Sequence, residues 1–318
     1  MEKMMRTTRP LAALGLVIAL ALSACGGSGG ASDSESIKLG FIAKYNNDYF
    51  LAMKDAVKEW DDDNKDVEVV VGQGKDGSDV DGQISLIESM VTQQVKGIAI
   101  APVSEGVQPA LEAAAEKGIK IILVDNDLPK FNQKTAVVST DNYAGGKLAG
   151  EWLAKQLKPG QTVGILDGIP GVPALDDRTN GMIEGLGKSF EVVQKVTTEC
   201  TQEKGVSGTE DILAAHPDVN AIYAACGPPV LGAIQTFSNK KVAPDDLLLV
   251  GFDGLPDEAK AILAGNEDAT VAQFPKKMGT VSLESLVEVI NGGTVEKTID
   301  TGTEIVTKDN AKKFTTFQ

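Results

Sequence analysis

The first regular element of the chain is written in residues 37–50, which are Ile37-Lys-Leu-Gly-Phe-Ile-Ala-Lys-Tyr-Asn-Asn-Asp-Tyr-Phe50. Leu39 to Ala43 is an apolar run with the length of a buried strand. After this stretch, apolar residues recur at helical spacing at Met53, Ala56, Val57 and Trp60. The polar and aromatic residues 44–50 therefore lie between a strand and a helix, at the strand end where open α/β sheets bind ligands.

The same order of strand, polar loop and helix recurs along the chain, roughly eight times in all. Runs of Val, Ile and Leu that alternate with amphipathic helices are typical of parallel sheets covered on both faces. We expect two series of strands, at 39–43, 67–71, 97–101, 119–124, 162–166, 191–196, 220–225 and 247–252.

Further elements follow the two series: a strand at Ala269–Phe274, a helix at Lys276–Asn291 and an extended stretch at Thr298–Val306. Elements that come after two complete series indicate that the chain crosses back between domains. The 318-residue chain is long enough for two domains. The economical architecture is a pair of α/β domains that face each other across a cleft.

The N-terminus has the features of an export signal. Basic residues precede an apolar run, Leu11 to Leu22, which is too short to span a bilayer as a helix. Leu22-Ser-Ala-Cys25 resembles a bacterial lipobox, which implies cleavage before Cys25 and lipidation of its thiol. The alternative is an ordinary secretory signal with a chance cysteine. Gly26 to Gly30 would supply the flexible tether of an anchored domain.

The acidic composition argues against two classes of partner. The formal net charge is −15 at pH 7, whereas nucleic acids and anionic membrane surfaces require a basic stripe. A solvated acidic surface that aids solubility is a sufficient explanation. Two cysteines remain after export, Cys200 and Cys226, and composition alone is equally consistent with a disulfide and with two buried free thiols.

Residues at the carboxyl ends of the expected strands offer carboxylates, amides, one arginine and aromatic rings, with few lysines. A hydroxyl group both donates and accepts, so a polyhydroxylated ligand pairs with all of these groups, and aromatic faces pack on its C–H surfaces. Charge-assisted bonds from aspartate and arginine would set specificity. The mixture predicts a neutral polyhydroxylated ligand. The residues are 44–50, 73–77, 104–105, 125–127, 167–171, Arg178, Cys200, 226–228 and 253–254.

Motifs of other site classes are incomplete. Gly72-Gln-Gly-Lys-Asp-Gly77 matches a dinucleotide-binding pattern by letter but does not open a helix directly. Asp79-Val-Asp-Gly82 lacks the glutamate of a calcium loop and is interpreted as a solvated turn. His216 is the single histidine, so neither a histidine triad nor a zinc site has its parts. The pair Asp176-Asp177 could serve as the two carboxylates of a glycosidase, but an acidic pair at the start of a helix, favoured by the helix dipole, explains it better. We expect no cofactor, no metal site and no enzyme.

Four motifs occur in order: Asn46-Asn-Asp-Tyr-Phe50, Asp141-Asn-Tyr-Ala-Gly-Gly-Lys147, Val250-Gly-Phe-Asp-Gly254 and Ala269-Thr-Val-Ala-Gln273. They resemble those of ribose-type periplasmic binding proteins, the solute receptors of bacterial ABC sugar importers. The resemblance implies two Rossmann-like lobes with parallel sheets, a three-crossover hinge near 139–141, 273 and 298–302, and closure around one sugar in the cleft. The implied parts are a signal peptide (1–24), a lipidated cysteine and tether (25–36), an N-terminal lobe (37–139 plus 274–300) and a C-terminal lobe (140–273 plus 301–318).

The same resemblance implies the residues that contact the ligand. The first lobe would contribute Asn47, Tyr49, Phe50 and Asp125, and the second lobe and hinge would contribute Arg178, Asp253 and Gln273.

Departures from the family pattern bear on the ligand. Asn126 replaces an arginine, Cys200 replaces a pocket aromatic, and Cys226 replaces a pocket amide. Because both cysteines fall at neighbouring pocket positions, the resemblance favours a Cys200–Cys226 disulfide. Lys44 is an added long donor. Loss of one aromatic face and one guanidinium argues against a pyranose held between rings, so we expect a pentose or a four- or five-carbon polyol such as xylitol or a tetritol.

The resemblance implies an exported, lipid-anchored monomer on the outer face of the cell membrane, either periplasmic or at the cell surface. It would deliver its ligand to the membrane permease of an ABC importer. Two alternatives are an exported sugar-acting enzyme and a sugar receptor for a membrane signalling sensor. A sugar-responsive regulator of the same fold would need a DNA-binding segment where this chain has an export signal.

Overall fold

A computed structural model describes residues 36–242 and 247–318. The predicted signal peptide (1–24), the lipidation site Cys25 and nearly all of the tether (25–36) lie outside the described residues. Within the described part of the chain, no helix is both long and apolar enough to cross a membrane.

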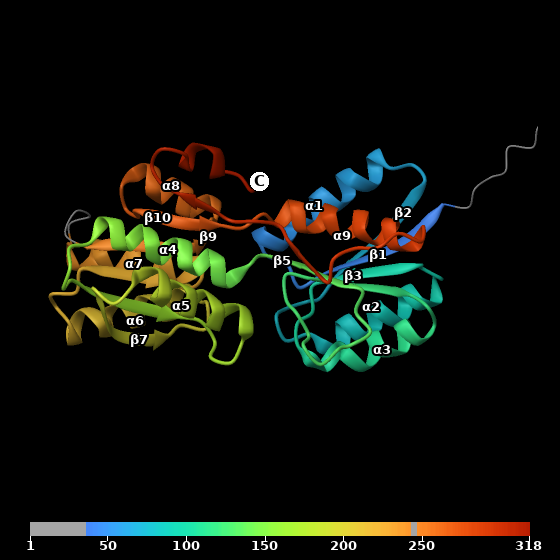
Figure 1. The fold of residues 1–318 in the computed structure, drawn as a ribbon, viewed down its shortest axis with the longest axis horizontal. Helices are drawn as coiled ribbons and strands as arrows, with labels where there is room; N and C mark the ends of the chain where they lie inside the picture. Colours follow the sequence, from blue (N-terminus) through green and yellow to red (C-terminus); the bar gives the residue numbers. More distant parts are fainter. Residues whose placement is uncertain (1–35, 243–246) are drawn as a thin grey trace, which may run out of the picture. The chain divides into compact units, whose positions relative to one another are not determined.

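The first sheet of the described chain has six parallel strands in the order β11-β5-β4-β3-β1-β2 (Figure 1). Buried strand residues alternate between its faces, so that Phe41 joins the core beside α1 and α9, and Ile42 joins the core beside α2 and α3. The strands are β1 (Ile37–Ala43), β2 (Val67–Gln73), β3 (Gly97–Ile100), β4 (Lys120–Val124), β5 (Ala136–Ser139) and β11 (Thr298–Asp300). The helices are α1 (Asp48–Asp63), α2 (Val80–Thr92), η1 (Glu105–Val107), α3 (Gln108–Glu116) and α9 (Pro275–Ile290).

The second sheet of the described chain also has six strands, in the order β12-β10-β9-β8-β6-β7. Five run parallel, and the edge strand β12 pairs with β10 in the antiparallel direction. The strands are β6 (Thr162–Asp167), β7 (Glu191–Thr197), β8 (Ala221–Ala224), β9 (Leu248–Asp253), β10 (Ala269–Ala272) and β12 (Glu304–Val306). The helices are α4 (Asn142–Gln156), α5 (Pro173–Leu186), α6 (Gln202–Ala215), α7 (Gly227–Lys240), α8 (Pro256–Ala264) and η2 (Ala311–Phe314).

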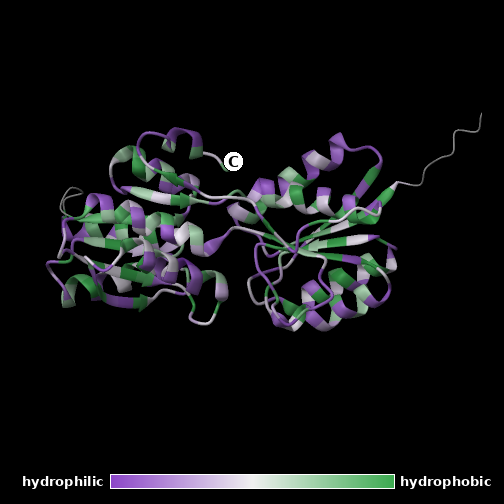
Figure 2. Ribbon diagram, viewed as in Figure 1, coloured by the Kyte–Doolittle hydropathy of each residue, from purple (hydrophilic) through white to green (hydrophobic). Residues whose placement is uncertain are grey.

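Helices cover both faces of the second sheet as well. Core residues of α4 and α5 lie on one face and those of α6 and α7 on the other. Figure 2 shows hydrophobic residues along the strands and hydrophilic residues on the outer sides of the helices. Hydrophobic burial on both faces is the physical reason that the strands appear in the sequence as continuous apolar runs. The predicted fold, with two lobes of α/β structure built on parallel sheets, is confirmed.

The chain passes between the two sheets three times: after β5, after β10, and between β11 and β12. The first and third of these segments are hydrogen-bonded to each other. The Thr301 N–H donates to the Ser139 carbonyl oxygen at 3.0 Å, and the Asp141 N–H donates to Asp300 Oδ1 at 3.0 Å. These contacts tie together parts of the chain that are far apart in sequence.

Several elements differ from the sequence predictions. The extended stretch expected at 298–306 is two strands in different sheets, and β5 was not predicted because its four residues are too few to show a period. The spacing of Met182, Leu186 and Phe190 predicts one helix through all three residues, but α5 ends at Leu186, where Gly187 has φ +78°. The interpretation of Asp79 as part of a solvated turn was wrong, because its side chain caps α2 by accepting the Gly82 N–H at 3.0 Å.

Helices α4 and α5 approach each other so closely that no side chain fits between their backbones. Two glycines on each helix, Gly146 and Gly150 on α4 and Gly181 and Gly185 on α5, form this contact. A Cβ atom at Gly181 would lie 2.1 Å from the carbonyl oxygen of Tyr143, well inside contact distance. The contact matters for the site because Arg178 lies one turn before Gly181 on α5.

Candidate functional site

Two aspartates stand at the carboxyl ends of strands in backbone conformations that side chains rarely adopt. Asp125 follows β4 with φ +67°, and Asp253 ends β9 with φ +105°. Such conformations cost on the order of 1–3 kcal/mol and persist only where the surrounding structure holds them. The Asp125 N–H donates to the Val138 carbonyl oxygen at 2.9 Å, and the Asp253 carbonyl oxygen accepts from the Gln273 N–H at 3.3 Å. Both carboxylates are therefore placed by the fold.

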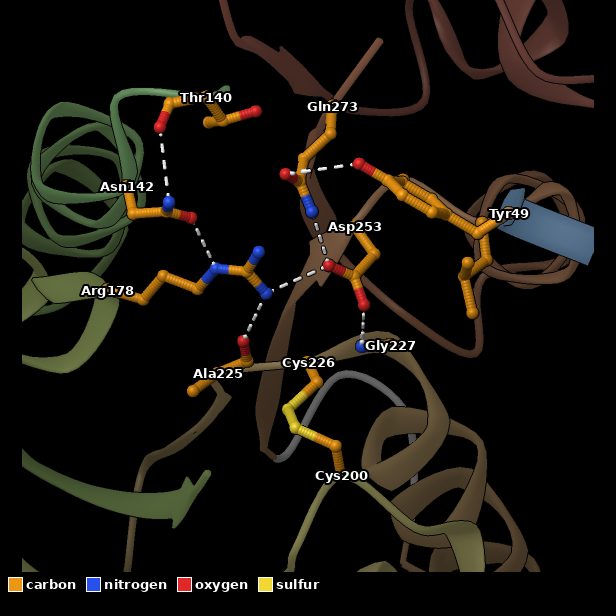
Figure 3. A network of polar contacts seen from close by, with 12 residues as sticks. Tyr49, Thr140, Asn142, Arg178, Cys200, Ala225, Cys226, Gly227, Asp253 and Gln273 are labelled. Atoms are coloured by element: carbon orange, nitrogen blue, oxygen red, sulfur yellow. Dashed lines mark hydrogen bonds and ion pairs between the residues drawn. A yellow bond between two sulfur atoms is a disulfide. The ribbon is translucent and has the colours of Figure 1, made fainter. Parts of the chain in front are cut away.

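Arg178 is a buried cation held on three sides (Figure 3). Its Nε donates to Asn142 Oδ1 at 2.8 Å, and Nη1 donates to the Ala225 carbonyl oxygen at 3.0 Å and to Asp253 Oδ1 at 2.9 Å. The guanidinium also lies 4.0 Å from the centre of the Phe252 ring, a cation–π contact. In Figure 3 the remaining terminal nitrogen carries no dashed line. The arginine is thus held in place, and its Nη2 has no hydrogen-bond partner among the described residues.

The Asp253 carboxylate is shared among several donors. Besides Arg178, its Oδ1 accepts from Gln273 Nε2 at 2.7 Å, and its Oδ2 accepts from the Gly227 N–H at 3.0 Å. Gln273 contacts the first lobe as well, because its Oε1 lies 3.5 Å from the Tyr49 hydroxyl. Arg178, Asp253 and Gln273, which come from α5, β9 and the residue after β10, therefore form one connected network.

The hydroxyl of Tyr49 lies near more hydrogen-bond acceptors than it can donate to. It is 3.3 Å from Asp125 Oδ1, 3.5 Å from Gln273 Oε1 and 3.4 Å from Met278 Sδ, and it has a single proton to donate. The two distances to oxygen acceptors are long for a hydroxyl donor, so the hydroxyl can be redirected to a new acceptor at small cost. Burial, followed by the Asp125 charge, raises the pKa of Tyr49 well above its usual value, which keeps the group a neutral phenol.

Asp125 has a raised pKa, chiefly because it is buried, while the positive charges of Lys44 and Arg178 act in the opposite direction. Asn126, which the resemblance pairs with an arginine of the family, is hydrogen-bonded to its neighbour Asp125. Its Nδ2 donates to the carboxylate oxygen Asp125 Oδ2 at 2.5 Å. Lys44 is half-buried, and its charge acts on Asp125.

The two remaining first-lobe residues have structural roles in the described chain. The Asn47 side chain caps α1 by accepting the Phe50 N–H at 2.9 Å, and its amide hydrogens have no hydrogen-bond partner among the described residues. The Phe50 ring is buried and packs edge-on against the rings of Tyr45 and Tyr49, with centroids 5.2 Å apart in each pair. Contact of either residue with a ligand stays a prediction.

Cys200 and Cys226 are joined by a disulfide, as the resemblance led us to expect. Their Cα atoms are 5.6 Å apart. Cys200 lies between β7 and α6, and Cys226 is the residue directly before α7, beside the Gly227 N–H that donates to Asp253. The disulfide therefore borders the Arg178–Asp253 network, as Figure 3 shows.

Sequence reasoning missed several members of this network. Asn142 and Phe252 were quoted only as parts of motifs, and the backbone groups of Ala225 and Gly227 gave no residue-type signal. Thr140 was also overlooked, although its hydroxyl oxygen is buried without a partner among the described residues. Its position directly before the Asp141–Lys147 motif is a signal that could have drawn attention to it.

Two buried glutamates lie behind the Asp253 loop. Glu258 accepts from the Leu255 N–H at 2.8 Å and from the Thr270 hydroxyl at 2.9 Å. Glu267 is buried as well, and its carboxyl group lies beside that of Glu258, so the two can share a proton in a hydrogen bond. Burial raises the pKa of Glu258 to about 8, and burial together with the Glu258 charge raises the pKa of Glu267 well above its usual value.

Because of these raised pKa values, we expect the free energy of unfolding to fall as pH rises from 4.5, the ordinary glutamate pKa, to about 8. In that range the unfolded chain has released protons that the folded chain retains, so the free energy of unfolding decreases with pH. Replacing both with glutamine (Glu258→Gln with Glu267→Gln) should remove on the order of a few kcal/mol of this dependence. Chemical denaturation between pH 5 and 8 measures it. Glu284→Gln, at an exposed position of α9, is the matched control, and equal pH slopes in all three proteins would contradict the prediction.

Comparisons with known proteins identify relatives of this chain. A family model described as "Periplasmic binding protein domain" matches residues 39–294. The ribose import binding protein RbsB of Escherichia coli (strain K12) is 30% identical over 296 residues, which cover 92% of this chain and 97% of that protein.

Solved structures are similar over comparable lengths. An ABC transporter solute binding protein from Bacillus halodurans C-125 with bound myo-inositol has a TM-score of 0.80 and 26% identity, covering 89% of this chain and 99% of that chain. One from Mycobacterium smegmatis with bound glycerol has a TM-score of 0.77 and 27% identity, covering 87% of this chain and 96% of that chain.

Proposed function

Because the chain belongs to the periplasmic binding protein family, we propose that it is the extracytoplasmic substrate-binding protein of an ABC importer for a small neutral sugar or sugar alcohol. The relatives that it matches are transport binding proteins and not enzymes. The observation that carries the proposal is the Arg178–Asp253–Gln273 network, which lies beside Tyr49 and Asp125: the Tyr49 hydroxyl is 3.5 Å from Gln273 Oε1 and 3.3 Å from Asp125 Oδ1.

The charges of this site favour a neutral ligand. Asp125 and Asp253 supply two carboxylates, and Arg178 and Lys44 supply two cations, so the four groups balance one another. A ligand hydroxyl can donate to Asp125 and accept from the open nitrogen of Arg178 at the same time. Phosphate or carboxylate ligands would need an excess of cations, which these groups do not offer.

A small ligand fits the departures from the family pattern. The disulfide stands where the pattern has an aromatic ring and an amide, and Asn126 is bonded to Asp125. Without one ring of an aromatic sandwich, a flat pyranose loses part of its packing surface, whereas a short chain of hydroxyls loses less. We therefore propose a pentose or a four- or five-carbon polyol such as xylitol or a tetritol. RbsB is named for ribose, and the two solved relatives hold glycerol and myo-inositol, all neutral polyhydroxylated molecules.

The proposal extends to the site residues and to the parts of the chain. Lys44, Asn47, Tyr49, Phe50, Asp125 and Asn126 would bind from an N-terminal lobe (37–139 plus 274–300). Arg178, Asp253 and Gln273 would bind from a C-terminal lobe (140–273 plus 301–318). Cleavage before Cys25 and lipidation of its thiol would anchor a monomer to the outer face of the membrane, where the closed form meets the permease.

A thermal-shift screen of the chain from Gly26 onward tests the proposal. Ribose, xylitol, erythritol, glycerol, myo-inositol and glucose are compared at equal concentration. A ligand at a hundredfold excess over Kd stabilises the folded state by about 2.7 kcal/mol, so the true ligand should give a clear rise in Tm. We expect the largest shift from a pentose, pentitol or tetritol. Response to glucose alone would contradict the ligand class, and recovery of a chemically altered ligand by NMR would point to an enzyme.

A further inference from the structure

One three-residue segment holds both partners of the buried ion pair. The Ala225 carbonyl oxygen accepts from Arg178 Nη1 at 3.0 Å, and the Gly227 N–H donates to Asp253 Oδ2 at 3.0 Å. Cys226 lies between these two backbone groups and is 2% exposed. Figure 3 shows the segment 225–227 passing beneath the Asp253 carboxylate, with the disulfide directly attached to it.

The other half of the disulfide is anchored independently. Cys200 comes from the turn between β7 and α6, where it and Glu199 both have positive φ, at +55° and +50°. The turn is tied to the sheet by Thr198, whose N–H donates to the Asp167 carbonyl oxygen at 2.8 Å and whose hydroxyl donates to the same oxygen at 2.7 Å. The disulfide thus connects the segment 225–227 to a second fixed point of the lobe.

The opposite side of the segment is closely packed. A Cβ atom at Gly227 would lie 2.5 Å from Leu255 Cδ1 and 2.7 Å from Glu258 Oε2. The start of α8 therefore limits the movement of Gly227 on one side, and the disulfide limits the movement of Cys226 on the other. With the disulfide broken, Cys226 loses its covalent connection to the turn between β7 and α6. The segment then depends on the packing of Gly227, on the Ala225 N–H that donates to the Leu166 carbonyl oxygen at 3.0 Å, and on its hydrogen bonds to Arg178 and Asp253.

We propose that the Cys200–Cys226 disulfide is a positioning element for the Arg178–Asp253 pair, so that its reduction weakens ligand binding. The inference rests on the proposed function, since it takes this pair to bind the ligand. Breaking the disulfide frees the Ala225 and Gly227 backbone groups to shift, and the acceptor of Arg178 and the donor to Asp253 shift with them. The affinity of the receptor then depends on the redox state of its surroundings.

The test compares three forms of the chain from Gly26 onward: oxidised, reduced, and Cys200→Ser with Cys226→Ser. Dithiothreitol is the reductant, and it supplies two electrons and two protons to form two thiols while it becomes a cyclic disulfide. The amide hydrogen-exchange rate of Gly227, measured in the absence of ligand, shows how firmly the segment is held. The exchange rate of Tyr223 in β8 is the internal reference. Calorimetric titration with ribose, xylitol and erythritol reads the affinity, at a temperature far below Tm.

We expect Gly227 exchange to accelerate at least tenfold in the reduced and serine forms, with Tyr223 unchanged, and Kd to rise about tenfold. The control variant Ile222→Val removes a methyl group from the core beside α6 and α7, so it lowers Tm while the disulfide stays intact. It should change neither the exchange rate of Gly227 nor Kd. Unchanged Gly227 exchange, or unchanged Kd in a protein that binds a probe, would overturn the proposal. Faster Gly227 exchange in a protein that binds none of the three probes would support the positioning role and refute the ligand class instead.

Discussion

Asp253→Ala is expected to weaken ligand binding at least a hundredfold and to lower the free energy of unfolding by about 3 kcal/mol. The substitution removes the acceptor of Arg178, Gln273 and the Gly227 N–H together. Arg178, which is 6% exposed, would then be a buried cation without its counter-ion, and that is the costly part of breaking a buried pair. Calorimetric titration and urea denaturation measure the two effects.

Two further variants separate binding from stability. Arg178→Met together with Asp253→Ala removes both charges, so it should recover stability relative to Asp253→Ala while binding stays lost. Asp257→Ala is the surface control, because its pair with Lys260 is solvent-exposed and worth little. An Asp253→Ala protein that binds ligand as the unmodified chain does would refute the assignment of this residue to the site.

Gly181→Val is expected to lower the free energy of unfolding by more than about 3 kcal/mol or to prevent folding. A side chain at this position would collide with the Tyr143 backbone of α4, which cannot move without separating the two helices. The same displacement would carry Arg178 away from Asn142 and Asp253, so ligand binding should weaken in any protein that does fold. Thermal denaturation and titration with the ligand measure both results.

Asn180→Val is the matched control for this substitution. It places valine one residue earlier on the same helix, at an exposed position, so it introduces the same β-branched side chain without the collision. We expect it to change stability by no more than about 0.5 kcal/mol. Equal stability of the Gly181→Val and Asn180→Val proteins would show that α4 and α5 do not depend on their glycines for close contact.

The apolar runs of the strands and the spacing of apolar residues in the helices were sufficient to predict most elements. Burial on both sheet faces produces runs such as Ile119–Val124, and these remain visible without any knowledge of the partner strands. Short elements were harder. Strand β5 has four residues, and β11 and β12 have three each, so their pairing depends on neighbours that are distant in sequence.

In the candidate site, too, some residues could be predicted from the sequence and others could not. Tyr49 and Asp125 follow strands of the first sheet, and Asp253 ends a strand of the second, so their place at the carboxyl ends of strands could be predicted. Asn47 shows the limit of that reasoning, because a residue type suited to a ligand is engaged in capping α1. The roles of Ala225 and Gly227 could not be predicted, since every residue except proline has the same backbone donor and acceptor.

By itself, then, the sequence determined the class of fold, the order of its elements, and the polar character of the strand ends, because these follow from local patterns of burial and charge. Tertiary structure alone decided that Gly146 and Gly181 bring α4 and α5 close enough to hold Arg178 in the site. It likewise decided that Asn126 donates a hydrogen bond to Asp125. It also decided that a disulfide borders the backbone groups that hold Arg178 and Asp253. These are contacts between residues far apart in the chain, or choices among several possible partners, and only the packed structure selects them.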